Sequence, residues 1–66
     1  MDNVEKVYEH IKSFMEEHGF PPTTKQIADS LKMVEKEVKS ALDELEKAGR
    51  LMIEKAKYKV IEVLEG

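Results

Sequence analysis

The first third of the chain contains a segment that no regular helix can cross. It runs Gly19-Phe20-Pro21-Pro22, and each proline pushes the residue before it into an extended conformation. Residues 2–18, ahead of this segment, carry apolar side chains three and four positions apart, the spacing of an amphipathic helix. Thr23 and Gln26 match a capping box and predict a second helix over residues 24–31. We therefore expect two helices joined by an extended connection, with Gly19 ending the first of them.

The spacing of apolar residues stays helical in the middle of the chain and changes near its end. After an interruption at residues 32–34, a third helix is predicted over residues 35–48, with an inner face formed by Val38, Ala41, Leu42 and Leu45. Residues 50–64 first alternate apolar and polar side chains and then become rich in Tyr, Val and Ile, as strands are. Two strands a few residues apart predict a β-hairpin. The joint between them lacks Gly, Asn and Asp, so it indicates no particular turn type.

Size and composition restrict the classes of function. A chain of 66 residues that is 41% hydrophobic and 38% charged fits one folded domain over residues 1–66. A domain this small has little room for a substrate pocket. Cysteine is absent, which excludes disulfides, thiolate zinc ligands and a cysteine nucleophile. We therefore expect no catalytic residue, no cofactor and no small-molecule substrate, and the chain is predicted not to be an enzyme.

Neither a membrane segment nor a metal site is predicted. No apolar run approaches the roughly 20 residues of a membrane span, and residues 1–3 lack the charge pattern of a signal peptide. A cytoplasmic location without membrane contact is therefore expected. His10 and His18 lie two helical turns apart, which is too far for one metal ion without other ligands.

Two runs of sequence carry a resemblance to a known family. Residues 19–31, GFPPTTKQIADSL, resemble the start of the DNA-binding domain of LexA-type repressors, and residues 38–51, VKSALDELEKAGRL, resemble a run shared by many winged-helix regulators. The resemblance covers residues 4–63. It implies an α+β winged helix-turn-helix fold with three helices followed by a C-terminal β-hairpin. It also implies binding to double-stranded DNA. We expect a small transcriptional regulator that stands alone, because a chain of this size has no room for a ligand pocket or a sensor domain.

The same resemblance implies which side chains face the duplex. The recognition helix would be residues 35–48, which would lie in the major groove. Its exposed Lys36, Lys39 and Ser40 would contact phosphates or base edges. Thr24 and Lys25 would open the preceding helix, whose N-terminus suits a phosphate. Lys55 and Lys57 would lie at the tip of the hairpin, the wing, beside the DNA backbone.

Several positions depart from the family pattern. Lys32 stands where the family often has Gly, and Val34 stands where Ser or Thr normally caps the recognition helix. Loss of that cap costs about 1 kcal/mol. Glu35 and Glu37 stabilise the helix, because they lie at the positive end of its dipole, but their carboxylates would also face incoming phosphates. The recognition helix carries no Arg, which weakens bidentate recognition of guanine.

Charge leaves a second hypothesis open. The formal net charge is -3, whereas nucleic-acid-binding domains are usually basic. The lysines of the recognition helix are equally consistent with a solvated face. Those of the hairpin, Lys55, Lys57 and Lys59, fit edge-strand lysines that discourage pairing between molecules slightly better than they fit a basic wing. The alternative function is a winged helix used as a protein–protein interaction module. A continuous positive face would favour DNA binding, and a face of mixed sign would favour the alternative.

The last strand also predicts a possible homodimer. Strand alternation places Val60 and Leu64 on one side, and Ile61 and Val63 on the other. One side closes the core, which leaves the other for the first helix or for a second copy. A dimer would enlarge the core of a very small chain.

Overall fold

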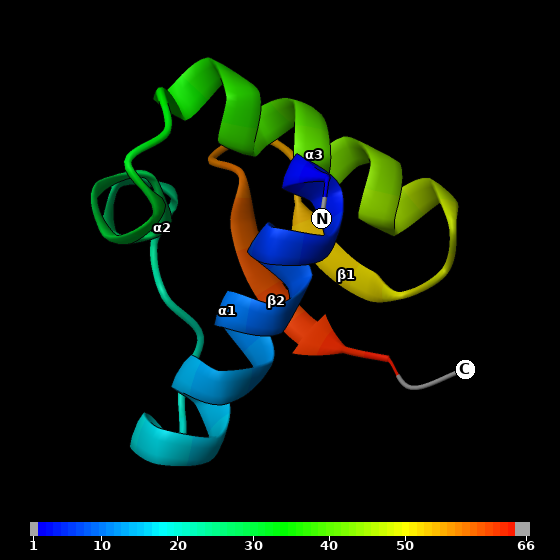
Figure 1. Ribbon diagram of the computed structural model, residues 1–66. Coiled ribbons are helices and arrows are strands. Elements are labelled where there is room, and N and C mark those ends of the chain that lie inside the picture. The colour runs from blue at the N-terminus through cyan, green and yellow to red at the C-terminus, as the bar shows by residue number, and fades with distance from the viewer. Residues whose placement is uncertain (1, 65–66) are drawn as a thin grey trace.

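The structure is a computed structural model that describes residues 2–64. Within this range three helices precede a two-strand antiparallel hairpin (Figure 1): α1 (Asn3–His18), α2 (Thr24–Leu31), α3 (Glu35–Lys47), β1 (Leu51–Glu54) and β2 (Lys59–Val63). The order and type of these elements confirm the predicted α+β, winged-helix layout. The bounds of α1 and α3 differ from the prediction by one residue, because Asp2 and Ala48 are caps.

The helices begin and end where their capping residues stand. The side chain of Asp2 accepts a hydrogen bond from the Glu5 amide at 2.9 Å, and Gly19 ends α1 with a left-handed φ of 80°. At the start of α2 both halves of the predicted capping box form. The Gln26 amide donates to Thr23 Oγ1 at 3.1 Å, and the Thr23 amide donates to Gln26 Oε1 at 2.9 Å.

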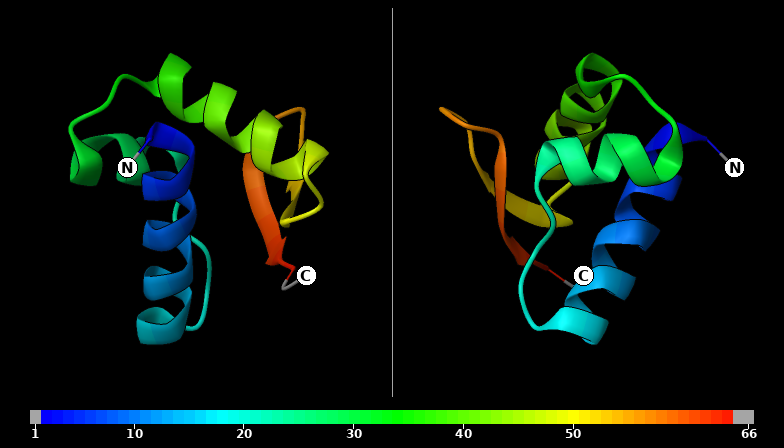
Figure 2. Two further views of the ribbon diagram at one scale, coloured as in Figure 1. Left: turned by 45° about the vertical axis from the view of Figure 1, so that its right-hand side comes forward. Right: turned by 90° about the vertical axis from the view of Figure 1, so that its left-hand side faces the viewer.

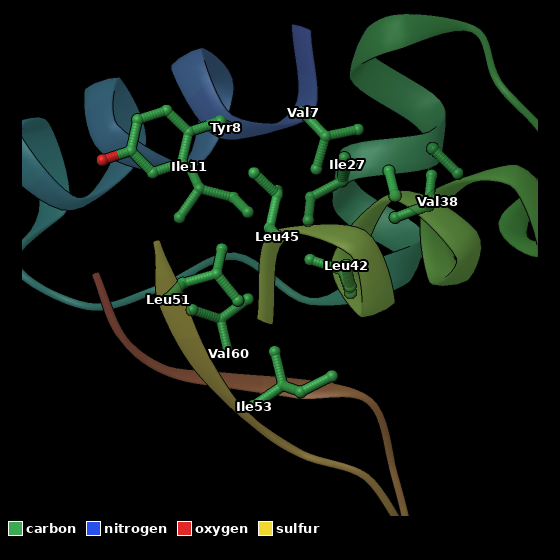
Figure 3. Close-up of a cluster of buried hydrophobic side chains, with 12 residues drawn as sticks. Val7, Tyr8, Ile11, Ile27, Val38, Leu42, Leu45, Leu51, Ile53 and Val60 are labelled. Atoms are coloured by element: carbon green, nitrogen blue, oxygen red, sulfur yellow. The ribbon is translucent and has the colours of Figure 1, made fainter. Parts of the chain in front are cut away.

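One apolar core joins the three helices to the inner face of the hairpin. In Figure 2 (left) α3 lies across the N-terminal end of α1 and across the hairpin, while the other end of α1 points away. The core residues that Figure 3 labels are Val7, Tyr8, Ile11, Ile27, Val38, Leu42, Leu45, Leu51, Ile53 and Val60. Because α3 buries its predicted inner face against the rest of the molecule, its opposite face is exposed.

The predicted faces of the last strand are wrong, because β2 contains a β-bulge. The cross-strand partners are Leu51 with Val63, Met52 with Glu62, Ile53 with Val60 and Glu54 with Lys59. Ile61 is therefore an extra residue, and a bulge shifts the alternation of the strand by one position. As a result, Val60 and Val63 both pack against the core, although they were predicted on opposite sides. Ile61 remains 53% exposed.

Arg50 connects α1 to the start of the hairpin. Its Nη1 donates to Glu5 Oε1 at 2.5 Å, and its guanidinium lies 3.8 Å from the centre of the Tyr8 ring. The hydrogen bond with Glu5 raises the pKa of Arg50. Arg50 is the only arginine in the sequence. These contacts give it a role in the fold.

Candidate nucleic-acid interface

The exposed face of α3 carries the three residues predicted to contact DNA. Lys36, Lys39 and Ser40 are all exposed, and they lie opposite the buried side chains of the same helix. At 100° per residue, Lys36 and Ser40 share the outward face while Lys39 lies toward one flank. Lys36 and Ser40 also line an open groove of about 270 Å³ between α3 and the first turn of α1.

Carboxylates occupy the N-terminus of α3. Val34 offers no side-chain acceptor there, as predicted. Instead, Glu37 turns back, and its Oε1 accepts a hydrogen bond from the Val34 amide at 3.3 Å. Only this half of a capping box forms, because a valine side chain cannot accept a hydrogen bond. Glu35 is also exposed in this turn. A phosphate that approaches this helix end therefore meets negative charge.

The two residues predicted to contact DNA from the first turn of α2 have different environments. Thr24 is buried, and its hydroxyl donates to the Tyr58 carbonyl at 2.9 Å. Its hydroxyl proton therefore holds the hairpin in place. Lys25, the next residue, is exposed. Of the pair, Lys25 is the one with a side chain open to a ligand.

The wing tip is a four-residue loop, residues 55–58. The Lys57 amide donates to the Glu54 carbonyl at 3.3 Å, and Tyr58 ends the loop with a φ of 51°. Lys57 is exposed. Lys55 Nζ lies 3.3 Å from Glu46 Oε1 on α3, and the pKa of Lys55 is raised by this partner.

Tyr58 brings three elements together. Besides the bond from Thr24, its hydroxyl donates to Asp43 Oδ2 at 3.1 Å, and Lys39 Nζ lies 5.5 Å from the centre of its ring. The hydrogen bond with Asp43 raises the pKa of Tyr58. We call this set of Tyr58, Thr24, Asp43 and Lys39 the Tyr58 junction. It joins the start of α2, the middle of α3 and the wing tip.

The structure therefore groups some of the predicted residues and separates others. Lys39 and Thr24 belong to the Tyr58 junction. Lys25 directly follows Thr24 in the chain, and Lys57 directly precedes Tyr58. Lys36 and Ser40 lie along the groove beside α1. The positive charges alternate with Asp43 and Glu46, so the face has mixed sign rather than one continuous positive charge.

Sequence reasoning missed Tyr58 and Asp43. Asp43 has the pattern of an ordinary charge on the surface of a helix, and Tyr58 that of a strand residue. Fifteen positions separate them, so no local spacing indicates that they meet. One clue was present: the hairpin joint has no Gly, Asn or Asp, so another residue has to adopt the left-handed conformation that such loops need.

The described residues form neither a metal site nor a membrane span. No group of three or more His, Asp or Glu side chains within residues 2–64 is placed to hold a metal ion. His10 and His18 both lie beside Phe14, at ring distances of 6.1 and 4.3 Å. No described helix is both long enough and apolar enough to cross a bilayer.

Comparison with known proteins agrees with this geometry. A search of curated proteins returned no significant match to the chain. The family model for the LexA DNA binding domain matches residues 3–59. This range contains α1, α2, α3, β1 and the whole wing tip. The match covers most of the chain and all of the Tyr58 junction, and the chain therefore belongs to the LexA DNA-binding domain family.

Proposed function

We propose that the chain acts as a small transcriptional regulator, with α3 in the major groove of duplex DNA and the wing against its backbone. The observation that carries this proposal is the Tyr58 junction, which fixes the wing tip beside the exposed face of α3. This arrangement supports the proposal that lysines from three elements, Lys25, Lys39 and Lys57, share one DNA-binding surface. A duplex that contacts the exposed face of α3 would therefore also lie close to the wing.

The lysines suit backbone contact better than base recognition. Lysine is a compact point charge without the fork geometry that arginine offers to guanine. Lys36 and Lys39 are therefore proposed to neutralise phosphates on either side of the groove, with Ser40 donating to a phosphate between them. Lys55 is paired with Glu46 in the free protein. An exposed ion pair of this kind is weak, so a phosphate can compete for its ammonium group.

A titration with duplex DNA of random sequence at several salt concentrations tests the proposal. Four to six lysines on phosphates predict a slope of log K against log salt of about -4 to -5, from about -0.9 per phosphate. We expect Lys39→Ala to weaken binding and to reduce that slope by about one. Lys12→Ala removes one positive charge from the middle of α1, beside Val63 rather than the wing tip, and serves as the matched control.

The outcome decides between the two hypotheses for this surface. Equal effects of Lys39→Ala and Lys12→Ala would show that only net charge matters. Absence of duplex binding at about 50 mM salt would contradict the proposal and support a protein-interaction module. The face of mixed sign favours that alternative, but the DNA-binding family of the chain outweighs it. The cytoplasmic location remains a prediction.

Homodimerisation also remains a proposal, on a smaller surface than the sequence indicates. The β-bulge takes Val63 to the core side and leaves Ile61 and Met52 exposed on the hairpin, at 53% and 46%. We propose that a second copy covers these two side chains. The wing tip, residues 55–58, precedes β2 and includes neither Ile61 nor Met52, so the proposed dimer contact and the proposed DNA contact use different residues.

A further inference from the structure

Tyr58 has a backbone conformation that its side chain does not favour. Its φ of 51° lies in the left-handed region, which glycine enters without steric cost and tyrosine does not. A residue held in such a region indicates that its surroundings determine the conformation, and such residues concentrate at functional sites. The question is which contacts hold it and what they accomplish.

Contacts from two separate helices hold Tyr58. Thr24 of α2 fixes its backbone carbonyl through a 2.9 Å hydrogen bond. Asp43 of α3 fixes its hydroxyl through a 3.1 Å hydrogen bond. One contact anchors the main chain and the other anchors the far end of the side chain. Together they define both the position and the rotation of the wing tip.

Asp43 is an acidic residue on the recognition helix, so a carboxylate presented outward at this position would repel DNA. Its geometry indicates otherwise. One carboxylate oxygen accepts from Tyr58, and the other is buried with no hydrogen-bond partner in the described residues. The carboxylate is therefore turned against the wing rather than presented outward. A residue selected only for surface charge has no reason to bury an oxygen atom.

We propose that Asp43 and Thr24 are positioning residues for DNA binding, which hold the wing tip through Tyr58 so that Lys57 reaches the duplex that α3 contacts. This inference rests on the proposed function. Neither residue touches DNA through the atoms concerned: the Thr24 hydroxyl and the Asp43 carboxylate are both engaged by Tyr58. Their effect on DNA is transmitted by the wing.

The test measures how much Lys57 contributes to DNA binding when the contacts of Asp43 or Thr24 with Tyr58 are removed. In the parent protein we expect Lys57→Ala to reduce the salt slope by about 0.9, the value for one phosphate. In the Asp43→Ala background we expect Lys57→Ala to change the slope by less than about 0.3. Asp43→Asn removes the same charge but keeps an oxygen that accepts from Tyr58, so there the contribution of Lys57 returns.

Thr24 provides a second matched pair. Thr24→Val removes the hydroxyl at nearly constant shape, and we expect it to abolish the contribution of Lys57 as Asp43→Ala does. Thr24→Ser keeps the hydroxyl and restores that contribution. If Asp43→Ala fails to fold in a thermal melt, Tyr58→Phe replaces it, because that change removes only the hydroxyl bonded to Asp43.

The outcomes separate this inference from the proposed function. If Lys57→Ala reduces the slope equally in the parent and the Asp43→Ala backgrounds, the positioning role is overturned and DNA binding stands. If Lys36→Ala reduces the slope but Lys57→Ala does not, α3 binds DNA without the wing, and the positioning role is again overturned. If neither lysine matters, the proposed function fails.

A measurement without DNA tests independently whether Asp43 and Thr24 hold the wing tip in place. Backbone order parameters near 0.85 indicate a rigid segment, and values below about 0.6 a flexible one. We expect residues 55–58 to fall from the first range toward the second in Asp43→Ala and Thr24→Val, but not in Asp43→Asn or Thr24→Ser. A wing tip that stays rigid in all four variants overturns the inference, whatever the DNA data show.

Discussion

Lys32 and Tyr58 occupy the left-handed backbone region for different reasons. Tyr58 is held there by partners on two helices. Lys32, with a φ of 56°, forms the C-cap of α2, and its amide donates to the Ala28 carbonyl. Its side chain is exposed. Within residues 2–64 the Lys32 side chain forms no hydrogen bond or ion pair, so no side-chain contact offsets the cost of its left-handed backbone.

Lys32→Gly should therefore stabilise the domain. The left-handed conformation destabilises a residue with a side chain by about 1–2 kcal/mol, and glycine avoids this cost. Glycine in turn loses about 0.5–1 kcal/mol, because its unfolded state has more conformational freedom. We expect a net gain of about 0.5–1 kcal/mol, a rise of several degrees in melting temperature for a domain of this size. Lys32→Gln removes the same charge without relieving the backbone and should leave the melt unchanged. Equal melting temperatures for the two variants would contradict the argument.

Glu37 combines two effects that one substitution separates. Glu37→Gln keeps an oxygen that accepts from the Val34 amide, and it removes a negative charge from the start of the recognition helix. We expect stronger duplex binding, because phosphates are no longer repelled. We also expect a loss of about 0.3–1 kcal/mol in stability, because an acidic group at a helix N-terminus is favourable. Titration and thermal melting should thus move in opposite directions, and a parallel change would contradict the assignment.

Elements were easier to predict than their junctions, because their information is local. The 3.6-residue period, the Thr23–Gln26 box and Gly19 are contained in short windows, and each predicted what the structure shows. The bulge at Ile61 was not predictable in this way. It depends on how β2 fits both β1 and the core, whereas the sequence of the strand is compatible with simple alternation.

The packing of α3 on the other elements is testable at Leu42. Its side chain is fully buried, at the centre of the core formed by the helices and the hairpin (Figure 3). Leu42→Ala should cost about 2–5 kcal/mol through lost burial and the cavity left behind. Small domains are only marginally stable, so the variant is expected to be largely unfolded at 37 °C. Circular dichroism on heating measures this, and an unchanged melt would show that the core is wrongly assigned.

At the scale of the whole molecule, the sequence predicted the fold and the lysine-bearing surface but not how that surface is held. The helical period of α3 alone predicts that Lys36, Lys39 and Ser40 are exposed. The contacts of Tyr58 with Thr24 and Asp43 span 34 and 15 positions of chain. Such contacts depend on where the hairpin packs, which a single sequence does not specify. The DNA-contact roles predicted from the sequence remain predictions, and the duplex titrations test them at Lys36, Lys39 and Lys57.

Association is the last property of the whole molecule that the exposed surface predicts. Ile61 and Met52 form the exposed apolar part of the hairpin, and two side chains bury much less area than a stable interface needs. We therefore expect weak dimerisation, seen in sedimentation equilibrium as a mass above the 7.6 kDa monomer only at tens of micromolar and above. Ile61→Lys should return the mass to that of the monomer, because a lysine on an edge strand opposes pairing. Since Ile61 is outside the core, the melting temperature should hardly change, which separates lost association from lost folding. A monomer mass for the parent protein across this range would contradict the dimer and leave Ile61 as an exposed residue of the bulge.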